Sequence, residues 1–107
     1  MVSMAQKFIV TKRGVMRVGH VSMHKDLLRN GDTCMGGGFW RFDPIEARLE
    51  LSGRSYDFGS PMWDYLLEHD ITLKIPDKYH GLSIVYKDND DAGTPLRISE
   101  VFKIEYV

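Results

Sequence analysis

The sequence predicts an α+β fold, a single domain in which a mixed β-sheet of about six strands carries two packed helices. Strand-like runs recur along the chain, and the alternation of apolar and charged residues over 47–51 is the clearest of them. Two other segments combine helical spacing with a capping residue, Ser22 in one and Ser60 in the other. Strand pairs separate the two helices, which is typical of an α+β layout.

Each element follows from a local pattern. The first helix begins after Ser22 and ends at Asn30-Gly31 after barely two turns, and the second begins at Ser60-Pro61 and continues to His69. Turn residues such as Lys12-Arg13-Gly14 separate the strands. Strands are expected, in chain order, at 8–11, 15–21, 33–42, 47–51, 82–86, 96–98 and 101–107.

Composition narrows the class of protein. The chain has 107 residues, enough for one core, and the 14 basic and 15 acidic residues leave a net charge of −1. This balance argues against a protein whose main task is binding nucleic acid or an acidic membrane. The one cysteine, Cys34, permits no intrachain disulfide, and no segment has the apolar length of a signal peptide or membrane span. We therefore expect a cytoplasmic protein without nucleic-acid or membrane partners.

Three short motifs lie in order and indicate a small anion site. They are His24-Lys25-Asp26, Gly36-Gly37-Gly38 and the segment 53–59, where Ser55 stands between flanking glycines. His24 is a candidate general base or nucleophile, against the alternative of a polar residue on an exposed helical turn. The glycine triplet fits a bulge or close backbone packing about as well as direct contact with a substrate.

Further residues complete the candidate site. Backbone amides of the Ser55-Tyr56-Asp57 turn are able to converge on phosphate oxygens, although a plain loop is the alternative reading. Lys7 offers an ammonium for a phosphate, unless it is simply solvated. The histidines lack metal-ligand spacing, so neither a metal nor a cofactor is expected.

These motifs resemble the Janus/Ocnus family, the protein histidine phosphatases, over roughly residues 7 to 90. The family pattern has a lysine followed by an aromatic residue, a strand leading to His-x-Asp, Cys-apolar-Gly-Gly-Gly, and Gly-x-Ser-x-x-aromatic-Gly. This chain has Lys7-Phe8, His24-Lys25-Asp26, 34–38 and 53–59 at the matching places. Residues 91–107 extend past the family's usual end and are expected to add a strand.

The resemblance implies a phosphohistidine phosphatase-like fold and metal-independent hydrolysis of the N–P bond of phosphohistidine, in proteins or small phosphoramidates. It makes His24 the proton acceptor and assigns substrate binding to Lys7 and the Ser55-Tyr56-Asp57 turn. Arg17 stands where counting places a family arginine. The alternative is a catalytically inactive member that acts as an anion-binding or protein-interaction module, which the short first helix and Asp57 favour.

Overall fold

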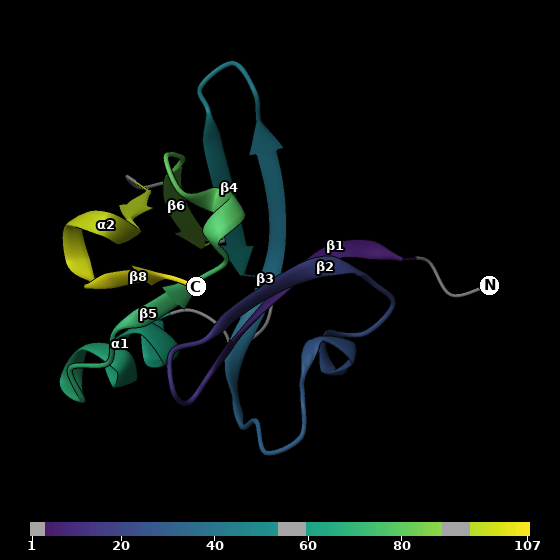
Figure 1. The fold of residues 1–107 in the computed structure, drawn as a ribbon, viewed down its shortest axis with the longest axis vertical. Helices are drawn as coiled ribbons and strands as arrows, with labels where there is room; N and C mark the ends of the chain where they lie inside the picture. Colours follow the sequence, from purple (N-terminus) through teal and green to yellow (C-terminus); the bar gives the residue numbers. More distant parts are fainter. Residues whose placement is uncertain (1–3, 54–59, 89–94) are drawn as a thin grey trace.

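A computed structural model describes residues 4–53, 60–88 and 95–107 of the chain (Figure 1). Strands form the largest class of secondary structure among the described residues, with two α-helices and two single turns of 3₁₀ helix, η1 and η2. The elements are β1 (Ala5–Thr11), β2 (Met16–Val21), η1 (His24–Leu27), β3 (Cys34–Asp43), β4 (Arg48–Gly53), α1 (Ser60–Glu68), β5 (Leu73–Ile75), η2 (Asp77–Tyr79), β6 (Ser83–Asp88), β7 (Leu96–Arg97), α2 (Ile98–Val101) and β8 (Ile104–Tyr106).

Six of the strands form one mixed sheet in the order β2-β1-β3-β4-β6-β7. All neighbours in it are antiparallel except β4 and β6, which are parallel. The β3–β4 hairpin extends beyond the other strands (Figure 1), and its tip is closed by the Asp43 carboxylate, which accepts the backbone N–H of Ile45 at 3.0 Å. β5 and β8 form a separate, parallel two-stranded sheet.

The predicted α+β class, mixed six-stranded sheet and two helices are therefore present, with differences in detail. The helix expected from Ser22 to Asn30 is a single 3₁₀ turn, because Leu28 already has an extended backbone (ψ 144°). The strand expected over 101–107 is limited to β8, preceded by α2. Ile98 and Phe102 are both buried while Glu100 between them is exposed, which fits a helical turn and not a strand, where all three would share one face.

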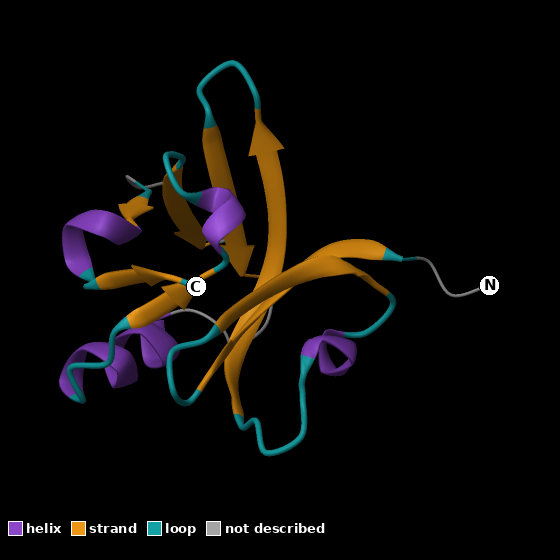
Figure 2. Ribbon diagram, in the orientation of Figure 1, coloured by secondary structure: helices purple, strands orange, loops and turns teal. Residues whose placement is uncertain are grey.

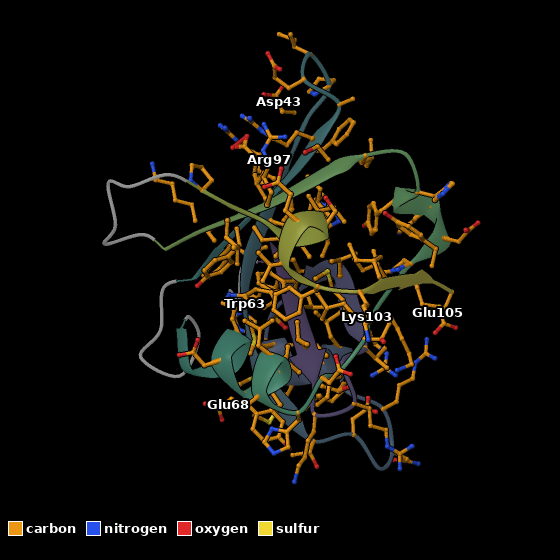
Figure 3. All side chains as sticks on the ribbon, turned by 90° about the vertical axis from the view of Figure 1, so that its left-hand side faces the viewer. Asp43, Trp63, Glu68, Arg97, Lys103 and Glu105 are labelled. Atoms are coloured by element: carbon orange, nitrogen blue, oxygen red, sulfur yellow. The ribbon has the colours of Figure 1, made fainter. Side chains whose placement is uncertain are left out.

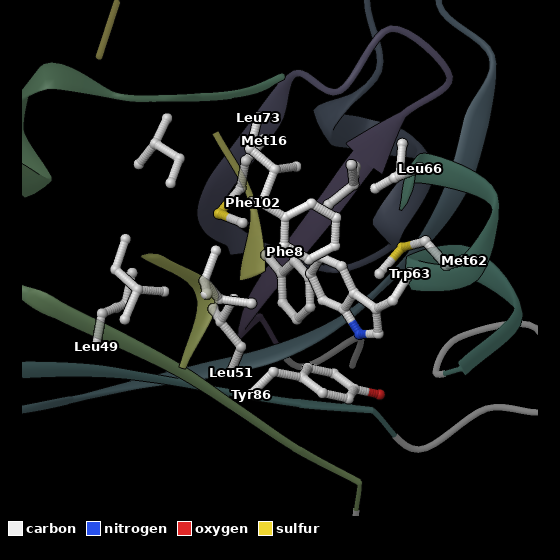
Figure 4. Close-up of a cluster of buried hydrophobic side chains, with 14 residues drawn as sticks. Phe8, Met16, Leu49, Leu51, Met62, Trp63, Leu66, Leu73, Tyr86 and Phe102 are labelled. Carbon is white, nitrogen blue, oxygen red and sulfur yellow. The ribbon is translucent and has the colours of Figure 1, made fainter. Parts of the chain in front are cut away.

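The main core lies on one face of the large sheet, where Phe8, Leu49 and Leu51 meet α1. Alternation in β4 explains the choice of face, since Leu49 and Leu51 are buried while the residues between and after them are half-buried. Figure 4 shows this cluster with Trp63 of α1 between Phe8 and Tyr86, and the Trp63 and Tyr86 rings meet edge to face with centroids 5.1 Å apart. In Figure 2 the helices α1 and α2 and the small sheet gather on the same side of the large sheet.

The other face of the sheet is covered only in part. η1 packs there against β1 and β2, and a Cβ added to Gly19 would lie 3.1 Å from the Leu27 side chain. Ile9, which alternates with the core residue Phe8, is fully buried without belonging to the main core. We call this second face, defined by Lys7, Ile9, Phe39, Glu50 and Val85, the open face.

Two glycines of the triplet bring backbones unusually close. A Cβ on Gly37 would lie 2.2 Å from the Phe8 carbonyl oxygen, and one on Gly38 would lie 2.0 Å from the Ser52 carbonyl oxygen. Both distances are far below van der Waals contact, so any side chain at either position forces the backbone apart. The pairing of β1 with β3 also shifts register between Val10 and Thr11.

Candidate functional site

Lys7 and Phe39 begin the candidate site because they stand directly opposite each other on β1 and β3. Directly paired residues of antiparallel strands point to the same face of the sheet. Lys7 is also paired with Gly19 of β2, the glycine that leaves room for η1. The open face therefore presents Lys7 and Phe39 beside η1, the turn that begins at His24 and packs against β1 and β2.

The turn η1 positions His24 next to Phe39. Its start is fixed by Asp26, whose carboxylate accepts the backbone N–H of Met23 at 3.0 Å and the Ser22 hydroxyl at 3.3 Å. An acidic side chain that accepts a backbone N–H in the first turn stabilises a helix start. Asp26 therefore orients the segment before His24.

The His24 imidazole has a defined orientation. Its Nε2 lies 2.8 Å from the carbonyl oxygen of Gly38, and its ring meets the Phe39 ring edge to face with centroids 5.5 Å apart. A carbonyl oxygen only accepts, so Nε2 donates in this contact, and in the neutral ring the basic lone pair is on Nδ1. Gly38 thus contributes both the close sheet contact and the hydrogen bond that selects the tautomer.

Lys7 reaches the same place from the sheet. Its ammonium donates to the carbonyl oxygen of Ser22, two residues before His24 in the chain. His24 in turn packs on Phe39, the strand partner of Lys7. The side chains of Lys7 and His24 therefore converge on Phe39, on one face of the sheet, although 16 residues separate them in sequence.

Arg17 lies on the open face as well, but its guanidinium is paired with the Asp32 carboxylate. Asp32 also accepts the backbone N–H of Arg29 at 2.8 Å. The bond from Arg29, followed by the hydrogen bond and charge of Arg17, lowers the pKa of Asp32 below its ordinary value. Arg17 thus secures the loop before β3, and the structure does not bring it to His24.

The Ser55-Tyr56-Asp57 turn lies outside the described residues. The described chain leaves β4 at Gly53 and resumes with α1 at Ser60. The preceding residue, Ser52, is the strand partner of Phe39, and its carbonyl oxygen is the atom closest to a Cβ added at Gly38. β4 therefore ends beside the residues that hold His24.

A second feature of the open face was not anticipated from the sequence. Next to Phe39, across β3, β4 and β6, lies a hollow of about 310 Å³ whose walls include Arg41, Arg48, Glu50 and Lys87. Alternation in 47–51 indicates that Arg48 and Glu50 point away from the core, but only the parallel pairing of Ser52 with Lys87 brings β6 beside them. The sequence carries no signal for that pairing.

Cys34 is half-buried at the start of β3, and its Sγ lies 3.4 Å from the Gly36 carbonyl oxygen. Burial raises the pKa of this thiol, which keeps it protonated and poorly nucleophilic near neutral pH. Within the described residues, no three His, Cys, Asp or Glu side chains gather as ligands for a metal ion. In the same part of the chain, no helix has the length and apolar character needed to cross a bilayer.

Comparison with known proteins adds no relative. No family model matches the chain, and neither a curated protein nor a solved structure matches it. What the site does must therefore be argued from its own residues.

Proposed function

We propose that the chain hydrolyses the N–P bond of phosphohistidine, with His24 as general base and Lys7 as a phosphate-binding residue, in the manner of the Janus/Ocnus protein histidine phosphatases. The observation that supports this most is the convergence of the Lys7 and His24 side chains on Phe39. A fixed base beside an ammonium is suited to a phosphoryl group, because phosphoryl transfer depends mainly on positioning and on neutralising oxygen charge.

In the proposed reaction, Nδ1 of His24 takes a proton from a water molecule as its oxygen attacks phosphorus. The new O–P bond forms while the N–P bond breaks, the leaving imidazole nitrogen takes up a proton from solvent, and Nδ1 of His24 then releases its proton to solvent. The products are orthophosphate and the free histidine side chain. Nε2 stays on the Gly38 carbonyl oxygen throughout, so the ring need not turn during the reaction.

Lys7 supports the phosphate oxygens in this scheme. An ammonium has three N–H donors, and the bond to the Ser22 carbonyl uses one of them. The same bond holds Lys7 close to the segment that carries His24, so the cation and the base are positioned together. We assign the remaining phosphate contacts to the Ser55-Tyr56-Asp57 turn, which follows β4 in the sequence.

The test is phosphate release from a phosphohistidine peptide by the wild type and by His24→Ala, with a chelator present. We expect His24→Ala to lower kcat/KM by about 10²–10⁴-fold, the usual contribution of a general base. His69→Ala is the matched control, since His69 is exposed and bonds to Tyr65 at the end of α1.

Lys7→Ala is expected to raise KM for the phosphohistidine peptide more than it lowers kcat, with Lys12→Ala as its control. Equal rates for the wild type and His24→Ala, or no phosphate release by a folded wild type, would contradict the proposal.

The second candidate function is an anion-binding or interaction module without turnover. It is favoured by the sheet contacts of Gly37 and Gly38, which demand glycine whether or not the protein is an enzyme. Saturable binding of inorganic phosphate that Lys7→Ala weakens, together with no phosphate release, would support this function instead.

A further inference from the structure

We propose that the hollow on the open face docks an acidic, extended protein segment, so that the substrate is a phosphohistidine within such a segment and not a free small phosphoramidate. This inference rests on the proposed function, because it places the hollow beside the reacting group. The hollow is lined by Phe39 and Ser52 at one end, and Phe39 is the residue on which His24 packs. Phe39 therefore borders both the hollow and the candidate catalytic residues.

Positive charge prevails in the hollow. Among the described residues that line it, Arg41, Arg48 and Lys87 are cationic and Glu50 is anionic. Arg97 of β7 is paired with Val85, another residue of the open face; its side chain is 64% exposed, with the Glu100 carboxylate 4.0 Å from its Nε. An anionic partner is the one that complements this surface.

The arginine side chains of the hollow have N–H donors that their neighbours in the described chain do not occupy. The Arg48 guanidinium lies 3.8 Å from Glu50 and 4.0 Å from Asp43, which are ion-pair distances too long for hydrogen bonds. The buried Nε of Arg48 has no hydrogen-bond partner in the described ranges of the chain. Arg41 does bond to Glu50, at 2.8 Å, but its side chain is 75% exposed and has further donors for a ligand. A carboxylate in the hollow would give these groups acceptors.

The geometry fits an extended segment. Arg41 is two residues from Phe39 along β3, roughly 7 Å, and Lys87 lies two strands from Phe39, roughly 10 Å. Because an extended chain advances roughly 3.3 Å per residue, a segment with its histidine at Phe39 would place an acidic residue about two positions away against Arg41 if it runs along β3, or about three positions away against Lys87 if it crosses β4. Figure 3 shows Asp43 at the tip of the β3–β4 hairpin, which bounds this surface at its far end.

An acidic protein segment suits the hollow better than a nucleic acid does. A nucleic-acid strand carries a phosphate at each nucleotide, and some of these would meet Glu50 and Asp43, the latter also within 4.0 Å of Arg48. In a peptide, by contrast, carboxylates can be spaced so that they lie only beside the cationic side chains of the hollow. The net charge of −1 also gives the chain no general attraction for polyanions.

The experiment uses two fluorescein-labelled peptides with one central histidine, flanked by Glu and Gly in one and by Gln and Gly in the other. Fluorescence anisotropy measures their binding to the wild type, to Arg48→Glu/Lys87→Glu, and to the control Lys12→Glu/Lys103→Glu, which has the same net charge. The control lysines are exposed and outside the hollow. Thermal unfolding verifies that both variants fold.

We expect the wild type to bind the Glu peptide more tightly than the Gln peptide. We expect Arg48→Glu/Lys87→Glu to weaken binding of the Glu peptide by about tenfold or more, from two reversed charges, while the control variant changes it by less than about threefold. With the peptides phosphorylated on histidine, the same variant should lower kcat/KM for the Glu peptide more than for the Gln peptide.

Equal binding of the two peptides, or equal losses in both variants, would overturn the docking surface. Displacement of the Glu peptide by a lower concentration of single-stranded oligonucleotide than of unlabelled peptide would also overturn it, in favour of nucleic acid. The two proposals fail separately. Charge-selective binding without phosphate release supports the docking surface and contradicts the phosphatase, whereas phosphate release without charge selectivity does the reverse.

Discussion

The face of the large sheet that carries Phe8 is sealed by α1, α2 and the small sheet, whereas among the described residues the face that carries Phe39 has η1 packed on its β1–β2 end and a hollow across β3, β4 and β6. The sealed face is lined by apolar residues at almost every inward position. The open face has charged residues around a hollow, with His24 and Lys7 at its edge. The difference between the faces indicates where the two kinds of residue act: substitutions on the sealed face should change stability, and those on the open face should change binding and turnover.

The largest effect on stability is expected on the sealed face. Leu66→Ala removes a side chain that is fully buried in the core, and should lower the free energy of unfolding by about 2–5 kcal/mol through lost burial and a cavity. Leu67, its neighbour on α1, is 45% exposed, so Leu67→Ala should cost less than about 1 kcal/mol. Urea unfolding measures the loss of unfolding free energy for both variants. Equal losses would contradict a buried side of α1 at Leu66 and an exposed side at Leu67.

A smaller loss of stability is expected from a substitution that moves the backbone of β3, because this strand borders both faces of the large sheet. Gly38→Ala places a methyl group 2.0 Å from the Ser52 carbonyl oxygen and should destabilise the fold by about 1–3 kcal/mol while also moving the acceptor of His24. Gly19→Ala is the matched control, because its methyl would meet side-chain ends and no backbone, with Leu27 at 3.1 Å and Val21 at 3.9 Å.

Because Gly38→Ala moves the carbonyl oxygen that accepts from His24, it should lower the rate of phosphate release. The loss should be larger than the unfolded fraction of the variant explains. Stability of Gly38→Ala equal to that of Gly19→Ala would show that β3 and β4 are further apart than described.

The smallest effect is expected from the loop behind the open face. Folding lowers the pKa of Asp32, so its contribution to stability is present above the unfolded pKa of about 3.9 and is lost as pH falls through the lower, folded pKa. Asp32→Asn should therefore flatten the fall of Tm below about pH 4, because the variant has no proton to bind there.

Asp70→Asn serves as the control for Asp32→Asn, since the Asp70 side chain is 81% exposed and only 3.4 Å from an exposed Lys103. Parallel Tm curves for the wild type and Asp32→Asn over this range would contradict the contacts of Asp32 with the Arg29 backbone and the Arg17 guanidinium.

Local patterns were sufficient for most of the large sheet and for α1. The alternation in 47–51 predicts both the strand β4 and its buried face, and Ser60-Pro61 marks the start of α1. The pattern failed where two periods overlap, because Ile98 and Phe102 fit a helical turn while 101–107 also alternates. β5 was missed because a three-residue strand before Pro76 offers little alternation to detect.

The candidate site likewise contains residues that local patterns predict and residues that they do not. His24 and Lys7 were predicted from motifs. Lys7 is the strand partner of Phe39, and the His24 ring packs on Phe39. Phe39 itself was not anticipated, because nothing in its local sequence distinguishes it from Trp40 or Phe42. The hollow depends on the pairing of β4 with β6, which joins residues more than thirty positions apart and which no local pattern predicts.

That parallel pairing has a consequence for the order in which the protein assembles. The hairpins β1–β2 and β3–β4 close through short connections, whereas β6 joins β4 only after the chain between them has been brought round. Long-range parallel pairing is slow because loop-closure entropy must be overcome before the new contacts form. During refolding, the contact of His24 with Phe39 therefore has a route to form early, while the docking surface is complete only when the last crossover closes.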